Sequence, residues 1–103
     1  MAALHAAGIV SYDIFKASLA QASLPEGLSP GVQALWWDAR GDWKRAHECA
    51  QEQDDQSGAW VHAYLHRKEG DLSNAGYWYK KARKPVATGP LDQEWDAIAR
   101  ALA

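Results

Sequence analysis

The sequence predicts an all-α domain built from antiparallel helical hairpins, and two observations carry this prediction. The stretch 32–46 is echoed 29 positions later by 61–75, and each copy contains the dipeptide Gly-Asp. An internal repeat of this length is typical of a supersecondary unit that buries its apolar face by stacking on a copy of itself. No segment alternates apolar and polar residues with the period of two that half-buried strands show, so we expect no strands.

The composition describes one ordinary globular domain. The chain has 103 residues, of which 48% are hydrophobic and 23% charged, so we expect a single domain over 1–103 with its own core, to which six tryptophans contribute. A net charge of −2 provides no overall attraction to nucleic acid or to an anionic membrane. No run approaches the ~20 apolar residues of a membrane-spanning helix. We therefore expect neither nucleic acid nor a membrane as a partner.

The expected compartment is the cytoplasm. Cys49 is the single cysteine and cannot form an internal disulfide, and one free thiol suits a reducing compartment. The apolar stretch 1–10 lacks the preceding Lys or Arg of a secretory leader, and Asp13 and Lys16 follow it closely.

The first two helices are expected before residue 40. Ser11 can cap a first helix over 11–23, and the segment Leu-Pro-Glu-Gly at 24–27 ends it. Ser29 and Pro30 open the second helix, with Ser as the cap and Pro at the first helical position, where its missing N–H costs nothing. An apolar stripe spaced i, i+3, i+4 and i+7 follows, as in a helix with one buried face.

Four further helices are expected after residue 40. A Gly-Asp dipeptide separates the two helices of each copy, and a polar turn at 54–58 separates the copies. The helices are predicted over about 43–53, 59–69 and 72–83, followed by a short Pro- and Gly-containing linker over 85–90. The chain closes with an amphipathic helix over about 91–103, which carries Leu91, Trp95, Ile98 and Leu102 on one face.

Small and aromatic residues recur at matching places in the two copies. The second copy has Trp60, Ala63, Gly70-Asp71-Leu72, Ala75, Tyr79 and Ala82, with Pro85 after them, and the first has Ala34, Gly41-Asp42-Trp43, Ala46 and Ala50. This pattern resembles the tetratricopeptide repeat (TPR), although the spacing of 29 is shorter than the ~34 residues typical of that family.

The resemblance implies a TPR-like right-handed superhelix of about two repeats, over 29–55 and 58–85, with flanking N- and C-terminal helices. Two repeats are fewer than the ~3 normally needed for stability. The helices expected over 11–23 and 91–103 must therefore act as caps, or the protein must form a homodimer.

The resemblance also implies a concave groove that binds a protein or peptide segment. The positions that would line this groove are Leu35, Asp38, Trp60, Tyr64, Arg67 and Lys68. Aromatic and cationic side chains together suit an extended peptide or an acidic tail. The expected function is thus a small, non-catalytic peptide- or protein-binding module. In the alternative interpretation, Trp60 and Tyr64 pack against the neighbouring terminal helix.

A second interpretation rests on histidines. His62 and His66 are spaced i, i+4, so their rings share one helix face and can hold zinc, with His47, Cys49 or Glu69 as candidates for a further ligand. The cluster of His47, Cys49, His62 and His66 would then serve a metal- or small-ligand-binding protein or an enzyme. In the structural alternative, these imidazoles are hydrogen-bonded within the helix interface. No catalytic residue is assigned, no cofactor is expected, and whether the protein is an enzyme stays open.

The orientation of the two histidines distinguishes these possibilities. A helical wheel places His62 and His66 opposite the apolar arc, in solvent, whereas the repeat pattern places them against the second helix of the pair. We favour the second placement because Trp37 occupies the position of His66 in the first copy. A buried histidine without an acidic partner should have a lowered pKa.

Overall fold

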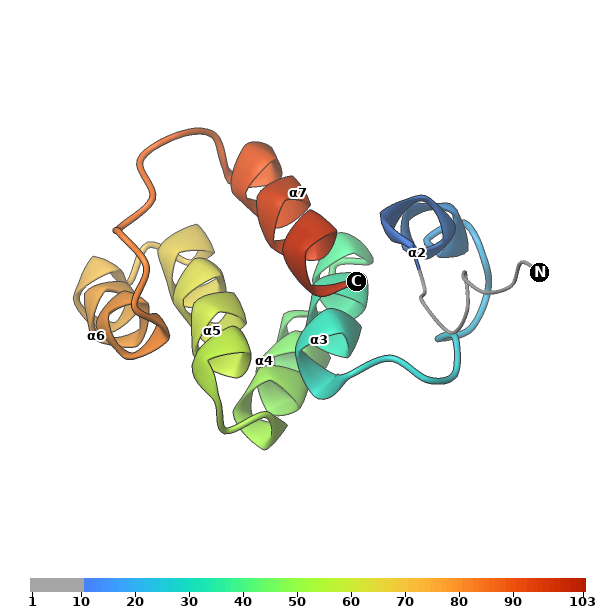
Figure 1. Cartoon of the computed structure of the whole chain (residues 1–103), viewed down its shortest axis with the longest axis horizontal. Helices are drawn as coiled ribbons and strands as arrows, with labels where there is room; N and C mark the ends of the chain where they lie inside the picture. Colours follow the sequence, from blue (N-terminus) through green and yellow to red (C-terminus); the bar gives the residue numbers. More distant parts are fainter. Residues whose placement is uncertain (1–10) are drawn as a thin grey trace.

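The computed structural model describes residues 11–103, and within this range the chain is all-helical without strands, as predicted. Figure 1 labels the six helices: α2 (Tyr12–Ser18), α3 (Pro30–Ala39), α4 (Trp43–Glu52), α5 (Gln56–Lys68), α6 (Leu72–Ala82) and α7 (Leu91–Leu102). The stretch 1–10, which we compared with a secretory leader, lies outside the described residues. From residue 11 onward, no helix has the length and apolarity needed to cross a lipid bilayer.

The repeated Gly-Asp dipeptide makes the same tight turn in both copies. Gly41 and Gly70 have φ angles of 81° and 86°, a left-handed conformation that glycine adopts without steric cost. Asp42 and Asp71 follow as N-caps, and their carboxylates accept hydrogen bonds from backbone N–H groups in the first turns of α4 and α6. The dipeptide therefore ends one helix and starts the next, which gives the hairpins α3–α4 and α5–α6.

Two helix boundaries differ from the sequence prediction. Helix α5 begins at Gln56 rather than near 59, because the Asp55 side chain accepts a hydrogen bond from Gly58 N at 2.8 Å and so caps the helix earlier. Helix α2 ends at Ser18 rather than near 23, and the Ser18 hydroxyl donates to the Phe15 carbonyl at 2.5 Å. Ser and Asp side chains that bond to nearby backbone groups are common at such helix ends.

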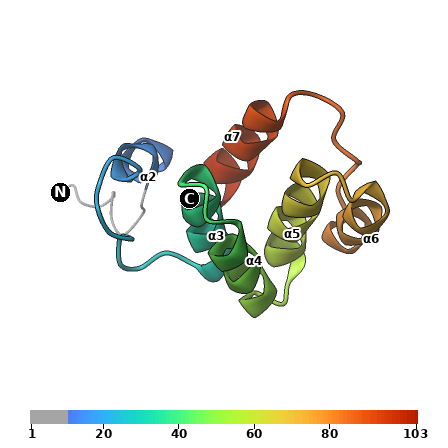
Figure 2. The ribbon, with the colours of Figure 1, turned by 180° about the vertical axis from the view of Figure 1, so that it is seen from behind.

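The terminal helices complete the core. Figures 1 and 2 both show α7 beside α3 and α5, with α6 on the other side of α5. Trp95 of α7 stacks on Phe15 of α2, with ring centroids 5.9 Å apart, and its indole N–H donates to the Leu35 carbonyl at 3.1 Å. The indole N–H of Trp36 in turn donates to the Ser18 carbonyl at 3.3 Å. Both terminal helices therefore pack against the repeated hairpins, as the capping alternative requires.

A smaller apolar cluster holds α6 against α5. Its buried members are Ala63 of α5 and Ala75 and Tyr79 of α6. The alanines allow the two helix backbones to approach closely, and the tyrosine fills the space beside them.

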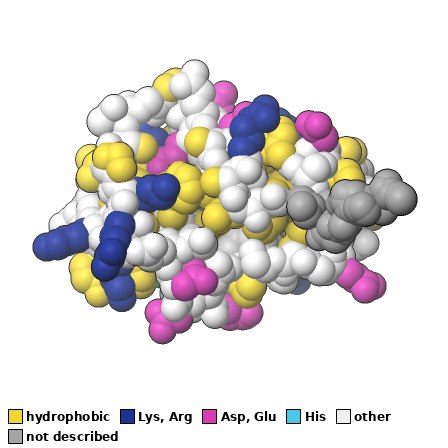
Figure 3. Space-filling view, in the orientation of Figure 1, with side chains coloured by type: hydrophobic (Ala, Val, Ile, Leu, Met, Phe, Trp, Pro, Cys, Tyr) yellow, Lys and Arg dark blue, Asp and Glu magenta, His cyan; other side chains and the backbone are white. Residues whose placement is uncertain are grey.

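Figure 3 shows Lys and Arg side chains gathered at the α6 end of the molecule, while no histidine is visible on this face.

Two helical glycines provide a matched test of the close backbone contact between α5 and the turn that precedes it. A Cβ added at Gly58 of α5 would overlap the backbone carbonyl of Gln53, whereas one added at Gly76 of α6 would meet nothing within 4 Å. Gly58→Ala is therefore expected to lower the free energy of unfolding by about 1–3 kcal/mol. Gly76→Ala is expected to raise it by up to about 1 kcal/mol, through the higher helix propensity of alanine. Urea denaturation measures both, and equal effects would contradict the close contact at Gly58.

Candidate functional site

Helix α7 packs against α3 and α5, next to the residues expected to line a peptide groove. Leu35 and Tyr64, which were expected to line this groove, are 0% and 2% exposed and belong to the same core cluster as Trp95. Asp38 is also buried, and its carboxylate accepts hydrogen bonds from the Tyr64 hydroxyl at 2.7 Å and the Lys68 ammonium at 2.9 Å. Burial raises the pKa of Tyr64, so its hydroxyl stays protonated and keeps donating to Asp38.

Arg67, another expected groove residue, is bound within the fold. Its guanidinium donates to the Glu94 carboxylate of α7 at 2.8 Å and to the Gly89 carbonyl, and the Tyr79 hydroxyl donates to the second oxygen of Glu94. Trp60 is half-buried and packs against the core, with the Lys84 ammonium 4.2 Å from the centre of its ring. Five of the six expected groove residues thus make contacts within the fold, and Trp60 packs against the neighbouring core. Three of the five, Asp38, Tyr64 and Lys68, also line a cavity of about 480 Å³ beside α7.

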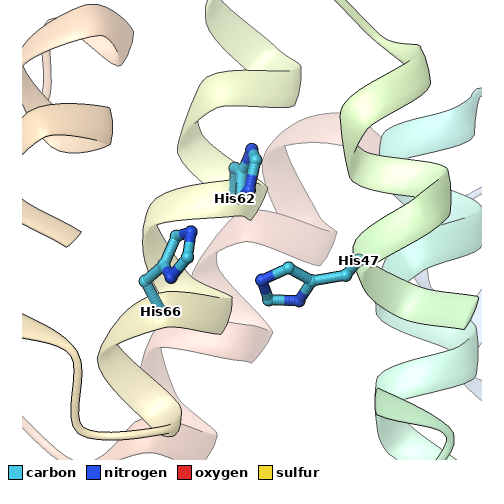
Figure 4. A group of neighbouring side chains, drawn as sticks. All are labelled: His47, His62 and His66. Carbon is cyan, nitrogen blue, oxygen red and sulfur yellow. The ribbon is translucent and has the colours of Figure 1, made fainter. Parts of the chain in front are cut away.

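Three histidines meet between α4 and α5. Figure 4 shows His47 pointing from α4 toward His62 and His66, which lie one turn apart on α5. One ring nitrogen of each can be chosen so that all three lie within 4.8 Å of one another. The i, i+4 spacing places His62 and His66 on one face of α5, and the packing of α4 against α5 adds His47.

The cluster is buried, and one member has no polar partner. His47 is 8% exposed and His62 is 5% exposed. His62 stacks on Trp78 of α6, the second helix of its hairpin, whereas His66 lies beside His47 of α4. Within the part of the chain that the structure describes, neither ring nitrogen of His47 has a hydrogen-bond partner. Because native proteins pair nearly all buried polar groups, an orphaned imidazole indicates that something else belongs beside it.

The protein environment keeps the two most buried histidines neutral. Burial, and after it the nearby His66 and His47 rings, lower the pKa of His62 to about 4. The pKa of His47 is also lowered, first by burial and then by His66. Both residues are therefore uncharged at neutral pH, and a neutral imidazole has the free lone pair that a metal ligand needs.

Aromatic rings and one carboxylate surround the histidines. The Trp43 ring stacks on His47 and the Trp78 ring stacks on His62, each with centroids 4.0 Å apart. A Glu69 carboxylate oxygen lies 2.7 Å from Nδ1 of His66 and 4.0 Å from Nε2 of His47. The sequence named Glu69 only as an alternative ligand, and nothing in it predicted that the two tryptophans stack on the histidines, because these contacts depend on how the helices pack.

Cys49 lies apart from the histidines, although the sequence placed it in the same candidate cluster. Its sulfur lies 4.0 Å from the Gln33 side-chain oxygen, and the residue packs against the main core. Burial raises the pKa of its thiol, which keeps it protonated and disfavours both nucleophilic attack and metal ligation.

Two cavities border the histidine cluster. One of about 340 Å³ lies against His62 and Trp78, and another of about 280 Å³ lies against Trp43 and Glu69. The tryptophan that stacks on His62 thus also lines the first cavity, and the tryptophan that stacks on His47 lines the second.

Comparison with known protein families, curated proteins and solved structures finds no match to this chain.

Proposed function

We propose that this protein binds a divalent transition-metal ion of the zinc type through His47, His62 and His66. The observation that carries the proposal is the convergence of three imidazoles, two of them buried, one of which has no hydrogen-bond partner at either nitrogen among residues 11–103. Imidazole nitrogen is a preferred ligand of zinc, copper and nickel ions. Binding an ion would satisfy the unpaired nitrogen and offset the cost of burying it.

The spacing of the nitrogens suits such an ion. Zinc–nitrogen bonds are ~2.0–2.1 Å long, so two ligand nitrogens on a tetrahedral ion lie about 3.4 Å apart. The three nitrogens here lie within 4.8 Å of one another, so small side-chain rotations would bring them to the ion. The nearly parallel rings of His62 and His66, with an interplanar angle of 14°, would have to diverge for both to point at it.

We also propose that α3 to α6 form two TPR-like repeats and that the junction between them holds the ion. Support comes from the identical Gly-Asp turns and caps of the two hairpins and from the position of His47 and His62 on adjacent helices of successive hairpins. In this proposal the repeats act as a rigid frame for the site. Peptide binding on the concave face is not part of it, because α7 covers Leu35 and Tyr64.

Zinc is expected to stabilise the protein against heat. An ion present at about 100 times its Kd stabilises the folded state by about 2.7 kcal/mol, which corresponds to a rise in Tm on the order of 10 °C for a domain of this size. The measurement compares melting of chelator-treated protein with and without zinc, together with the bound metal per chain after dialysis. We expect one zinc ion per chain.

Two variants make this test specific. His62→Phe keeps an aromatic ring beside Trp78 but removes one ligand, so it should lose most of the zinc-induced rise in Tm. Glu52→Gln changes an exposed carboxylate on α4 and should retain the full rise. Substoichiometric zinc in the unmodified protein, or an equal rise in His62→Phe, would refute the proposed site.

A further inference from the structure

The histidine cluster provides three ligands, whereas zinc in proteins usually has four. Structural zinc sites complete the set with a fourth side chain, and sites with three protein ligands leave one position for water or another exchangeable ligand. The candidates for a fourth ligand are Glu69 and Asp71, whose carboxylates lie near His66, and Cys49, which the sequence had suggested. Each of them already has another role in the fold.

Glu69 contacts Nδ1 of His66 through the same carboxylate oxygen that lies 4.0 Å from Nε2 of His47. An ionised carboxylate only accepts hydrogen bonds, so the contact of 2.7 Å places the proton of His66 on Nδ1. Nε2 of His66 then carries the lone pair and is the atom available to an ion. A histidine that binds metal through one nitrogen commonly donates its other N–H to a carboxylate, which fixes the ring orientation.

Asp71 and Cys49 are engaged elsewhere. The Asp71 carboxylate caps α6, where it accepts from the backbone N–H of Asn74 at 3.3 Å and from the Asn74 amide at 2.6 Å. The Cys49 sulfur lies 4.0 Å from the Gln33 side-chain oxygen, and the residue packs against the main core. Coordination by either residue would require breaking a cap or moving a side chain out of the core.

Space for an external ligand exists beside the cluster. The cavity of about 340 Å³ is lined by His62 itself, and its volume is several times that of a water molecule or a small anion. Lys81 lines the same cavity and contributes a positive charge, next to the carboxylates of Asp54 and Asp55. Asp55 is occupied in capping α5.

We infer that the ion held by His47, His62 and His66 keeps one coordination position open to water or a small anion, and that Glu69 is a positioning residue for His66. The inference rests on the proposed metal site and adds that this site exchanges ligands, as opposed to serving only as a structural clamp. It predicts that a small molecule can reach the ion while the ion stays bound to the protein.

Cobalt(II) provides the test because its visible absorption reports the number and type of its ligands. The full chain is loaded with one cobalt ion and titrated with sodium azide, first as the unmodified protein and then as Glu69→Gln. We expect azide to change the absorption in a saturable way while cobalt stays bound. Glu69→Gln should bind cobalt ~10–100-fold more weakly, with the same absorption spectrum and the same response to azide. Glu52→Gln, at an exposed carboxylate on α4, should match the unmodified protein.

The possible failures are distinguishable. If azide leaves the spectrum of the cobalt-loaded protein unchanged, the open position is refuted while the metal site stands. If Glu69→Gln changes the spectrum in the way expected for loss of a ligand, Glu69 coordinates the ion and its positioning role is refuted. If cobalt and zinc both fail to bind stoichiometrically to the unmodified protein, the proposed function itself is refuted.

Discussion

Replacing Glu94 with alanine is expected to lower the free energy of unfolding by about 3–5 kcal/mol. The side chains of Glu94 and Arg67 are 7% and 14% exposed, and they form an ion pair of 2.8 Å that joins α7 to α5. Removing one partner of a buried pair leaves the other charge without compensation in a medium that solvates it poorly. The Tyr79 hydroxyl loses its acceptor in the same substitution.

Urea denaturation followed by tryptophan fluorescence measures this effect. An exposed pair offers the control: Arg100 lies 3.4 Å from Asp96 with a side-chain exposure of 62%, so Arg100→Met should cost less than about 1 kcal/mol. A triple variant with Arg67→Met, Glu94→Leu and Tyr79→Phe leaves no buried charge or unpaired hydroxyl at this contact, so it should be more stable than Glu94→Ala. A Glu94→Ala cost no larger than that of Arg100→Met would show that the pair does not hold α7 in place.

Acidification is expected to destabilise the metal-free protein between about pH 6.5 and pH 4. In the unfolded chain His62 titrates near 6.5, whereas in the folded protein burial lowers its pKa to about 4. Between these values the unfolded state binds more protons than the folded state, so the free energy of unfolding falls as the pH falls. Through this difference in the pKa of His62, the free energy of unfolding falls by about 3 kcal/mol, and most of the fall has occurred when the pH reaches 4. His47 adds a loss in the same direction.

Denaturation in the presence of a chelator, at several pH values, measures this loss. His62→Phe cannot be protonated at this position, so its free energy of unfolding should fall less over the same pH range. Carboxylates with lowered pKa values, such as Asp55 and Asp71, contribute their own loss in both proteins at more acidic pH. Identical pH profiles for the two proteins would contradict the assignment of the low pKa to His62.

Local sequence signals predicted the helices well. The all-α class, the two hairpins and the Gly-Asp turns follow from short-range rules, because caps and left-handed glycines act within a few residues. The two boundary errors have the same origin. Asp55 and Ser18 both bond to nearby backbone, and the sequence alone did not show which of several polar residues would do so.

The candidate site was predictable in part. The i, i+4 spacing placed His62 and His66 on one face of α5, since helix geometry alone sets that relation. Whether His47 or Cys49 would join them depended on which side of α4 packs against α5. The two residues lie two positions apart on α4 and therefore point in different directions, and the structure turns His47 toward the histidines and Cys49 toward the core.

The sequence by itself determined the repeated hairpins of this protein and the paired histidines on one helix. The tertiary structure alone decided that α7 packs against α3 and α5, in one core with Leu35 and Tyr64, and that His47 completes a cluster of three imidazoles. The physical reason is the range of the interactions. Capping and helical spacing act between near neighbours in the chain, whereas the packing of α7 and α4 on α5 depends on the shapes of surfaces that only the folded chain brings together.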